Sequence, residues 1–288
     1  MKKLRQMRKA LTMIELIFVI VILGIVASLG AEIIAQTYES YIVQRAQYRA
    51  TSKTELALNE IANRLRYAIP GTVGFRATTG GSFKLITEPN TGSDKVLQWV
   101  AYDGDSFEAI NSSTSTGSAR RPGWSGFCDI DKYTSGSTIL STPGSYLDLA
   151  DTIIGNLGGD IANAVIYFPD GSNYGIASGT DENITLDSAI PSGMGKRIFE
   201  RYKLAWSSYA LVCENGTLDY CGDLYLYYNF TPTTGATLGT NKSLLLKNVY
   251  NFRFKGSEGS LRIKICKTEL MDSNTSEPIR ACKEKVIF

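Results

Sequence analysis

The side-chain inventory of this sequence limits the chemistry that the protein could perform. The chain contains no histidine. This excludes a histidine-based catalytic triad, a histidine-ligated zinc site and the usual general base at neutral pH. Carboxylate, lysine and cysteine chemistry stay open, but the sequence has no Walker loop, no nucleophile elbow and no paired-cysteine zinc pattern. We therefore expect no enzymatic activity and no cofactor.

The acidic residue with the most unusual surroundings is Glu15. It is the only charged residue in an otherwise apolar run over residues 11–31, and a basic leader of residues 1–10 with five Lys and Arg and no acid precedes that run. About twenty apolar residues are enough to cross a bilayer, and the basic leader favours a cytoplasmic N-terminus. Because a carboxylate in a membrane helix is costly, Glu15 indicates a function and a partner. The alternative is a solvated carboxylate at the headgroup level of a simple membrane anchor.

The element that must position Glu15 is a long helix. Apolar residues recur at three- and four-residue steps from Ile33 to Ile69, and Pro70-Gly71 is the first strong stop signal. The pattern predicts one helix from residue 11 to about residue 68, about 87 Å long at ~1.5 Å per residue. Residues 11–31 would lie in a membrane or filament core, and residues 32–69 would pack an amphipathic face on a folded domain. The alternative is two helices, a membrane anchor and a separate soluble helix.

A secretory signal would be cut behind its apolar core, but a cut there would sever this continuous helix, so the processing site is expected in front of it. The first thirty residues resemble the N-terminus of the type IV pilin and type II secretion pseudopilin family. The family motif is a small residue, a methylated apolar residue, Thr, two apolar residues and Glu, and in this sequence it reads Ala10, Leu11, Thr12, Met13, Ile14, Glu15. The family usually has Gly in place of Ala10 and Phe in place of Leu11.

This resemblance implies how the N-terminus is processed and used. A prepilin peptidase would cut between Ala10 and Leu11, and the new amine of Leu11 would be methylated. Thr12 and Glu15 would take part in assembly, with Glu15 pairing with the amine of a neighbouring subunit. The implied partners are other pilin or pseudopilin subunits, the peptidase and an inner-membrane assembly platform. The implied location is the bacterial inner membrane, with residues 70–288 in the periplasm, and then the pilus or pseudopilus.

The charge balance of the sequence does not indicate nucleic acid as a partner. The net charge is +2, but the leader holds five of the 30 Lys and Arg, so the processed chain would carry 25 basic against 28 acidic residues. Nucleic-acid binding depends on clustered basic residues that neutralise several phosphates. No nucleic acid is predicted.

From residue 70 onward, short alternating runs bounded by turn residues predict antiparallel sheet. Residues 95–102 and 223–230 read as strands, and residues 164–168 and 173–177 read as a hairpin around Asp170-Gly171. A second hairpin pairs Tyr250, Phe252 and Phe254 with Leu261, Ile263 and Ile265, and its apolar face is the expected partner of the helix. Residues 104–159 are expected to be loop-rich, a candidate for a variable, subunit-specific surface.

The five cysteines of an exported domain suggest two disulfides and one leftover thiol. Fifteen pairings are possible, and sequence proximity favours Cys213–Cys221 and Cys266–Cys282, with Cys128 free. The alternative is reduced, buried cysteines. The second bridge would close a loop that looks like the cysteine-bounded C-terminal loop of many type IV pilins.

Two further small signals follow from the family resemblance and the composition. Some pseudopilins carry calcium, and the best carboxylate set here is Asp103, Asp105 and Glu108. The calcium-loop pattern is incomplete, and turn-capping aspartates explain these acids more simply, so no metal site is predicted. The weaker pairs are Asp129 with Asp131 and Asp148 with Asp151. Asn183 and Asn274 match a bacterial glycosylation acceptor pattern of a kind that arises often by chance.

The sequence thus predicts an α+β, pilin-like fold, with a long N-terminal helix packed on an antiparallel sheet. The expected function is structural: a minor pseudopilin of a type II secretion pseudopilus, with segment 64–70 resembling the J-type subunit. The nearest alternative is a minor pilin of a type IV pilus or DNA-uptake machine. An alternative of another class is a membrane-anchored periplasmic binding domain or enzyme.

Overall fold

The structure is a computed structural model that describes residues 12–90, 94–111, 120–190, 198–217, 220–257, 259–269 and 278–287. The chain forms two compact units. The first is Met1–Arg49 with Glu269–Ile279, and the second is Ala50–Thr268 with Arg280–Phe288.

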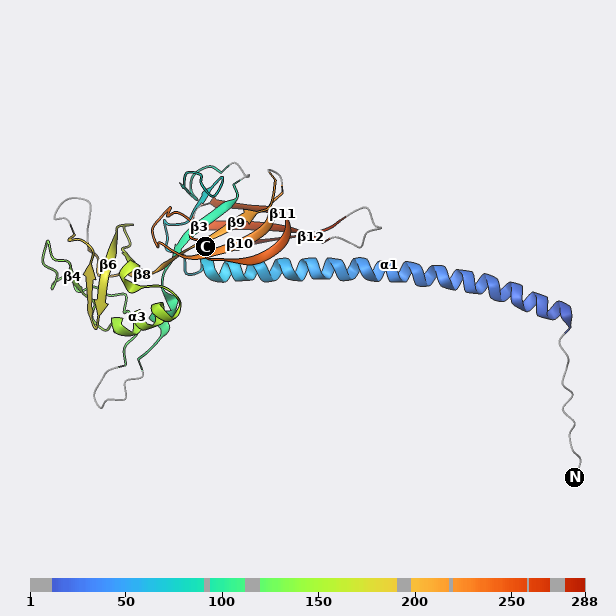
Figure 1. Ribbon diagram of the computed structural model, residues 1–288, viewed down its shortest axis with the longest axis horizontal. Helices are drawn as coiled ribbons and strands as arrows, with labels where there is room; N and C mark the ends of the chain where they lie inside the picture. Colours follow the sequence, from blue (N-terminus) through green and yellow to red (C-terminus); the bar gives the residue numbers. More distant parts are fainter. Residues whose placement is uncertain are drawn as a thin grey trace, which may run out of the picture. The chain divides into compact units, whose positions relative to one another are not determined.

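The helices and strands follow one another along the chain as a long helix and then a series of short elements (Figure 1). The helices are α1 (Met13–Leu65), α2 (Gly104–Glu108), α3 (Leu147–Asn156) and the 3-10 turn η1 (Ile161–Asn163). The strands are β1 (Gly74–Arg76), β2 (Lys84–Leu85), β3 (Val96–Ala101), β4 (Ile139–Ser141), β5 (Val165–Tyr167), β6 (Asn173–Thr180), β7 (Asn183–Leu186), β8 (Lys203–Ala205), β9 (Ser207–Glu214), β10 (Gly222–Phe230), β11 (Lys242–Ser257), β12 (Ser260–Glu269) and β13 (Ile279–Ile287).

Helix α1 is continuous over 53 residues, which confirms the prediction of one helix rather than two. It ends three residues earlier than predicted, at Leu65. The next residues turn onto strand β3: the N–H of Ile69 donates to the carbonyl of Val100 at 2.9 Å, and the N–H of Tyr102 donates to that of Tyr67 at 2.9 Å. Pro70-Gly71 follows this turn, and Gly71 has a φ of +81°, which favours glycine.

The C-terminal part of α1 buries one face. The side chains of this face recur at three- and four-residue steps, and they are Ala50, Thr54, Ala57, Leu58, Ile61, Ala62 and Leu65. The buried hydroxyl of Thr54 donates to the carbonyl of Ala50 at 2.7 Å, so it is satisfied within the helix. Between residues 32 and 49 the structure differs from the prediction, because Ile33, Ile34 and Tyr38 are exposed and continue the exposed apolar surface of the preceding segment.

The buried face of α1 packs on an eight-stranded sheet with the strand order β13-β12-β11-β10-β9-β3-β1-β2 among the described residues. Figure 1 shows the C-terminal part of α1 lying along one face of this sheet. Its core contains Leu58 and Ile61 of the helix with Trp99, Leu224 and Ile263 of the sheet. We call this sheet and its helix face the large lobe. The predicted packing of helix on antiparallel sheet is therefore confirmed.

The predicted hairpin of residues 250–254 with residues 261–265 is confirmed as β11 and β12, although Tyr250 lies at a register shift between Val249 and Asn251 and is only half-buried. Phe252 lies opposite Ile265 and Phe254 opposite Ile263, and all four side chains are buried. The predicted strand over residues 223–230 is confirmed as β10, but an even alternation of its side chains fails at the end. The register on β9 shifts between Tyr227 and Phe230, so Phe230 lies in the cluster of Tyr227 and not in that of Leu224 and Leu226.

The prediction of a loop-rich stretch over residues 104–159 is wrong in part, because it contains α2, β4 and α3. A five-stranded sheet of order β4-β7-β6-β5-β8 and helix α3 surround a second core within the described residues. Leu147, Ala150 and Ile154 of α3 are fully buried in it. We call this part the small lobe. Three apolar residues at helical spacing give a hydrophobic face even in a short helix.

The two lobes meet through a small apolar cluster. It joins Ile69, which follows α1, and Val100 of the large lobe to Val165, Tyr167 and Ala205 of the small lobe. A main-chain hydrogen bond from Asp103 to Leu204, 2.7 Å long, lies beside it. The residues directly after β3 and within β8 therefore hold the lobes together.

A matched pair of substitutions tests the packing of α1. Leu58 is 3% exposed and Leu56 is 69% exposed, two residues apart on the same helix. We expect Leu58→Ala to lower the free energy of unfolding by about 2–5 kcal/mol, since it removes buried methyl groups and leaves a cavity. Leu56→Ala should change it by less than about 0.5 kcal/mol. Urea unfolding of the full chain in detergent, followed by tryptophan fluorescence, measures both. Equal effects of the two substitutions would contradict the assigned face.

Candidate assembly helix

Glu15 lies in the first turn of α1 and is exposed. The carbonyl of Thr12 accepts hydrogen bonds from the N–H of Glu15 at 3.1 Å and of Leu16 at 3.2 Å, so Thr12 begins the helical hydrogen-bond pattern. A carboxylate in the first turn is favoured by the positive end of the helix dipole. Ala10 and Leu11, the predicted cleavage and methylation residues, lie outside the described residues.

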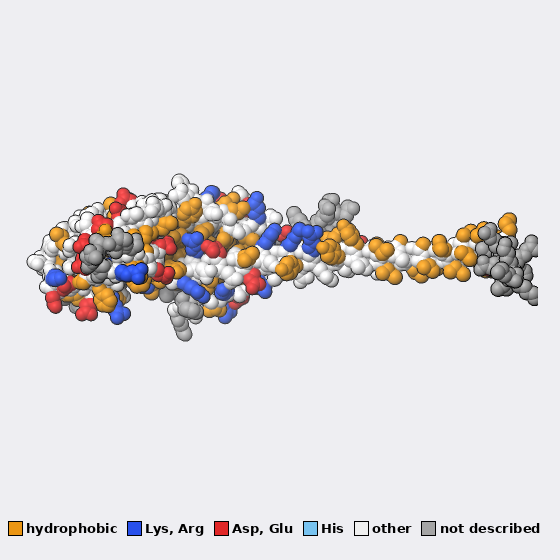
Figure 2. Space-filling view, turned by 90° about the horizontal axis from the view of Figure 1, so that it is seen from below, with side chains coloured by type: hydrophobic (Ala, Val, Ile, Leu, Met, Phe, Trp, Pro, Cys, Tyr) orange, Lys and Arg blue, Asp and Glu red, His pale blue; other side chains and the backbone are white. Residues whose placement is uncertain are grey.

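Behind Glu15 the helix surface is apolar. Every large hydrophobic side chain from Met13 to Leu29 is exposed. Figure 2 shows hydrophobic side chains along much of this exposed length. The helix is long and apolar enough to span a membrane. Such a continuous apolar surface is stable only in lipid or against other apolar surfaces.

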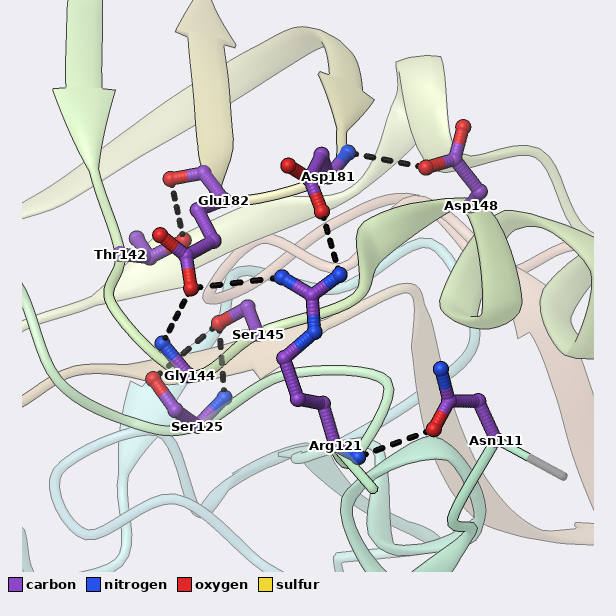
Figure 3. A network of polar contacts seen from close by, with 9 residues as sticks. All are labelled: Asn111, Arg121, Ser125, Thr142, Gly144, Ser145, Asp148, Asp181 and Glu182. Atoms are coloured by element: carbon purple, nitrogen blue, oxygen red, sulfur yellow. Dashed lines mark hydrogen bonds and ion pairs between the residues drawn. The ribbon is translucent and has the colours of Figure 1, made fainter. Parts of the chain in front are cut away.

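A polar network ties the small lobe together (Figure 3). Arg121 makes ion pairs with Asp181 at 2.7 Å and with Glu182 at 3.3 Å. The carboxylate of Glu182 also accepts from the N–H of Gly144 at 3.0 Å, and the N–H of Asp181 donates to Asp148 at 2.9 Å. Because Arg121 neutralises both acids and links three segments, this network positions loops rather than a reacting group.

Two of the acidic residues considered for calcium make other contacts. Asp103 is buried and caps α2 by accepting from the N–H of Ser106 at 3.1 Å, and burial raises the pKa of its carboxyl. Asp129 pairs with Lys132 at 3.2 Å, and this contact lowers the pKa of Asp129. Among the residues that the structure describes, no three Asp, Glu, His or Cys side chains gather in a way that could hold a metal ion.

The structure contains the two disulfides that sequence proximity favours, Cys213–Cys221 and Cys266–Cys282. The first joins β9 to the residue before β10, and the second joins β12 to β13. Each therefore fixes neighbouring strands of the large lobe. Cys128 is free and buried in the small lobe, where burial and the nearby Asp129 raise the pKa of its thiol to about 11.

Only one of the two glycosylation candidates lies among the described residues. Asn183 is exposed at the start of β7, and Asn274 lies outside the described residues. The Arg121 network was not predicted from the sequence, because its members come from three separate segments. The only local signal was the Asp181-Glu182 pair at a turn, and nothing in the sequence indicates that Arg121 is its partner.

No protein-family model, characterised protein or solved structure matches this chain. We therefore infer the function of the chain from its residues and their geometry.

Thiol titration tests the cysteine assignment. In the native full chain without reductant, we expect almost no reaction with iodoacetamide at pH 8, because a buried thiol with a pKa of about 11 is protonated there. After unfolding in urea, one thiol per chain should react, and the Cys128→Ser variant should show none. Three or five reactive thiols in the unfolded wild-type chain would contradict the two disulfides.

Proposed function

We propose that this chain is a structural subunit of a membrane-assembled filament, a minor pseudopilin of a type II secretion pseudopilus. The observation that carries the proposal is Glu15, an exposed carboxylate in the first turn of a helix that has no other charged residue before Glu32 and exposes large hydrophobic side chains over that length. In this proposal a prepilin peptidase removes residues 1–10, and the new amine of Leu11 becomes methylated. The inner membrane holds the chain until it is assembled.

The physical basis is the cost of an unpaired carboxylate in a low-dielectric environment. A carboxylate within a membrane helix is expensive by itself, and a positive partner offsets much of that expense. The amine created at Leu11 would be four residues from Glu15, a spacing at which the two groups could also pair within one helix. The amine of a neighbouring subunit can reach it when the helices stack side by side. Each helix would then be placed in register with the next by one charge pair.

The folded lobes support a structural rather than catalytic role. The buried face of α1 from Ala50 to Leu65 packs on the sheet of the large lobe, so this part of the helix belongs to the folded domain. The disulfides Cys213–Cys221 and Cys266–Cys282 crosslink the same lobe. Disulfides are typical of domains located outside the reducing cytoplasm.

Mass spectrometry of the mature N-terminus tests the processing step. In cells that make a prepilin peptidase, we expect a chain that begins at a mono-methylated Leu11. In a strain without the peptidase, the chain should keep residues 1–10. An unprocessed chain in both strains, or cleavage after Ala27 or Ala31, would contradict the proposal and favour a simple membrane anchor.

Assembly is tested with Glu15→Gln and the matched variant Glu39→Gln. Both residues are exposed acids of α1, but only Glu15 lies in the first turn. A hydrogen bond to a charged group contributes about 1.5–3 kcal/mol, so we expect Glu15→Gln to lower the chain's amount in sheared filaments at least tenfold. Glu39→Gln should stay within about twofold of the wild type. Quantitative immunoblotting of sheared fractions measures this, with the membrane fraction as the expression control. Normal assembly of the Glu15→Gln chain would count against the role of the carboxylate.

The systems in which such a subunit could work are separated genetically. Deletion of the chain should reduce secretion of folded proteins from the periplasm and leave twitching and DNA uptake unchanged. Loss of twitching or transformation with normal secretion would move the proposal to a minor pilin of a type IV pilus or DNA-uptake machine.

A further inference from the structure

A cavity of about 570 Å³ lies where the two lobes meet. Residues that follow α1 and β3 line it from the large lobe, and residues around β5 and β8 line it from the small lobe. Its volume falls within the range typical of small-molecule sites, roughly 300–1,000 Å³. Its aromatic lining includes Tyr102, Phe107, Trp124, Phe127, Tyr167 and Phe168. A cavity with aromatic rings on several sides can bind the flat apolar part of a small molecule.

The aromatic side chains of the cavity are held in place by hydrogen bonds to residues outside it and by packing against one another. The indole N–H of Trp124 donates to the carbonyl of Asp103 at 2.9 Å, and the hydroxyl of Tyr167 donates to the carbonyl of Pro232 at 2.8 Å. The rings of Phe107 and Trp124 pack with centroids 4.7 Å apart. The cavity is therefore formed before any ligand enters, which limits the entropy that binding would cost.

Two cations line the same cavity. The guanidinium of Arg201 lies over the Phe127 ring at 5.7 Å, and the ammonium of Lys203 lies over the Tyr102 ring at 4.7 Å. Neither side chain has an ion pair within the described part of the chain, and no acidic residue lines the cavity. Burial without a carboxylate lowers the pKa of Lys203. The cavity therefore combines an apolar interior with two cations that form no ion pair with any described side chain.

We propose that this cavity binds a small organic anion, a carboxylate attached to a flat apolar or aromatic body. The body would lie among the aromatic rings, and the carboxylate would pair with Arg201 and Lys203. A polyphosphate fits less well, since it would need several more donors than two side chains and a mostly aromatic wall provide. This inference does not depend on the proposed function, because every residue that it uses lies after Ala50 and away from the first turns of α1.

Equilibrium dialysis with 2-naphthoate and its uncharged amide, 2-naphthamide, tests the proposal. The full chain is used in a nonionic detergent, and empty detergent serves as the blank. We expect one saturable site per chain and at least tenfold tighter binding of the acid than of the amide. Equal binding of acid and amide, or no saturable binding of either, would overturn the proposal without the need for any variant.

A matched pair of double variants then assigns the site. Arg201→Gln with Lys203→Gln removes the two cations of the cavity, and Arg253→Gln with Lys255→Gln removes two exposed cations with the same spacing on β11. We expect the first to bring the affinity for the acid down to that of the amide, and the second to change it less than twofold. Circular dichroism of both variants checks folding. Equal losses in the two variants would show charge attraction to the whole chain and overturn the assigned site.

Discussion

The organising constraint of this structure is a stretch of apolar helix that the rest of the chain does not bury. Every large hydrophobic side chain from Met13 to Leu29 is exposed, although burial of one such side chain contributes about 1.5–3 kcal/mol. Lipid or neighbouring helices can supply that burial. A lone carboxylate at the start of this stretch, Glu15, is costly in lipid unless it finds a positive partner. In the proposed function, the membrane location of the chain and its need for partners both follow from these two facts.

The C-terminal part of the same helix is buried on one face by the rest of the domain. From Ala50 to Leu65 its buried side chains are small or branched, so the helix packs closely on the eight-stranded sheet. The disulfides fix strands of that sheet to one another. The small lobe adds its own core around α3 and is joined to the large lobe by the cluster that contains Ile69 and Val165. A single helix thus connects an apolar segment to a well-packed domain.

Part of this structure was predictable from the sequence. The long helix follows from the absence of Pro before Pro70, and the hairpin of β11 and β12 follows from strict alternation through Phe252 and Phe254. Helix α3 was missed because its three buried residues are embedded in a Gly- and Ser-rich stretch, where local composition favours loops. The cavity beside Lys203 could not be predicted, because residues from distant segments form it only when both lobes are folded.

The most direct test of the central claim asks what covers the apolar helix in the cell. A photo-crosslinking p-benzoylphenylalanine in place of Phe18 reports the neighbours of the exposed face. We expect ultraviolet-dependent adducts with other subunits that carry the same kind of N-terminal helix, and we expect these adducts to increase when filaments assemble. Adducts with lipid alone, under conditions in which the secretion or pilus machinery is active, would contradict the central claim.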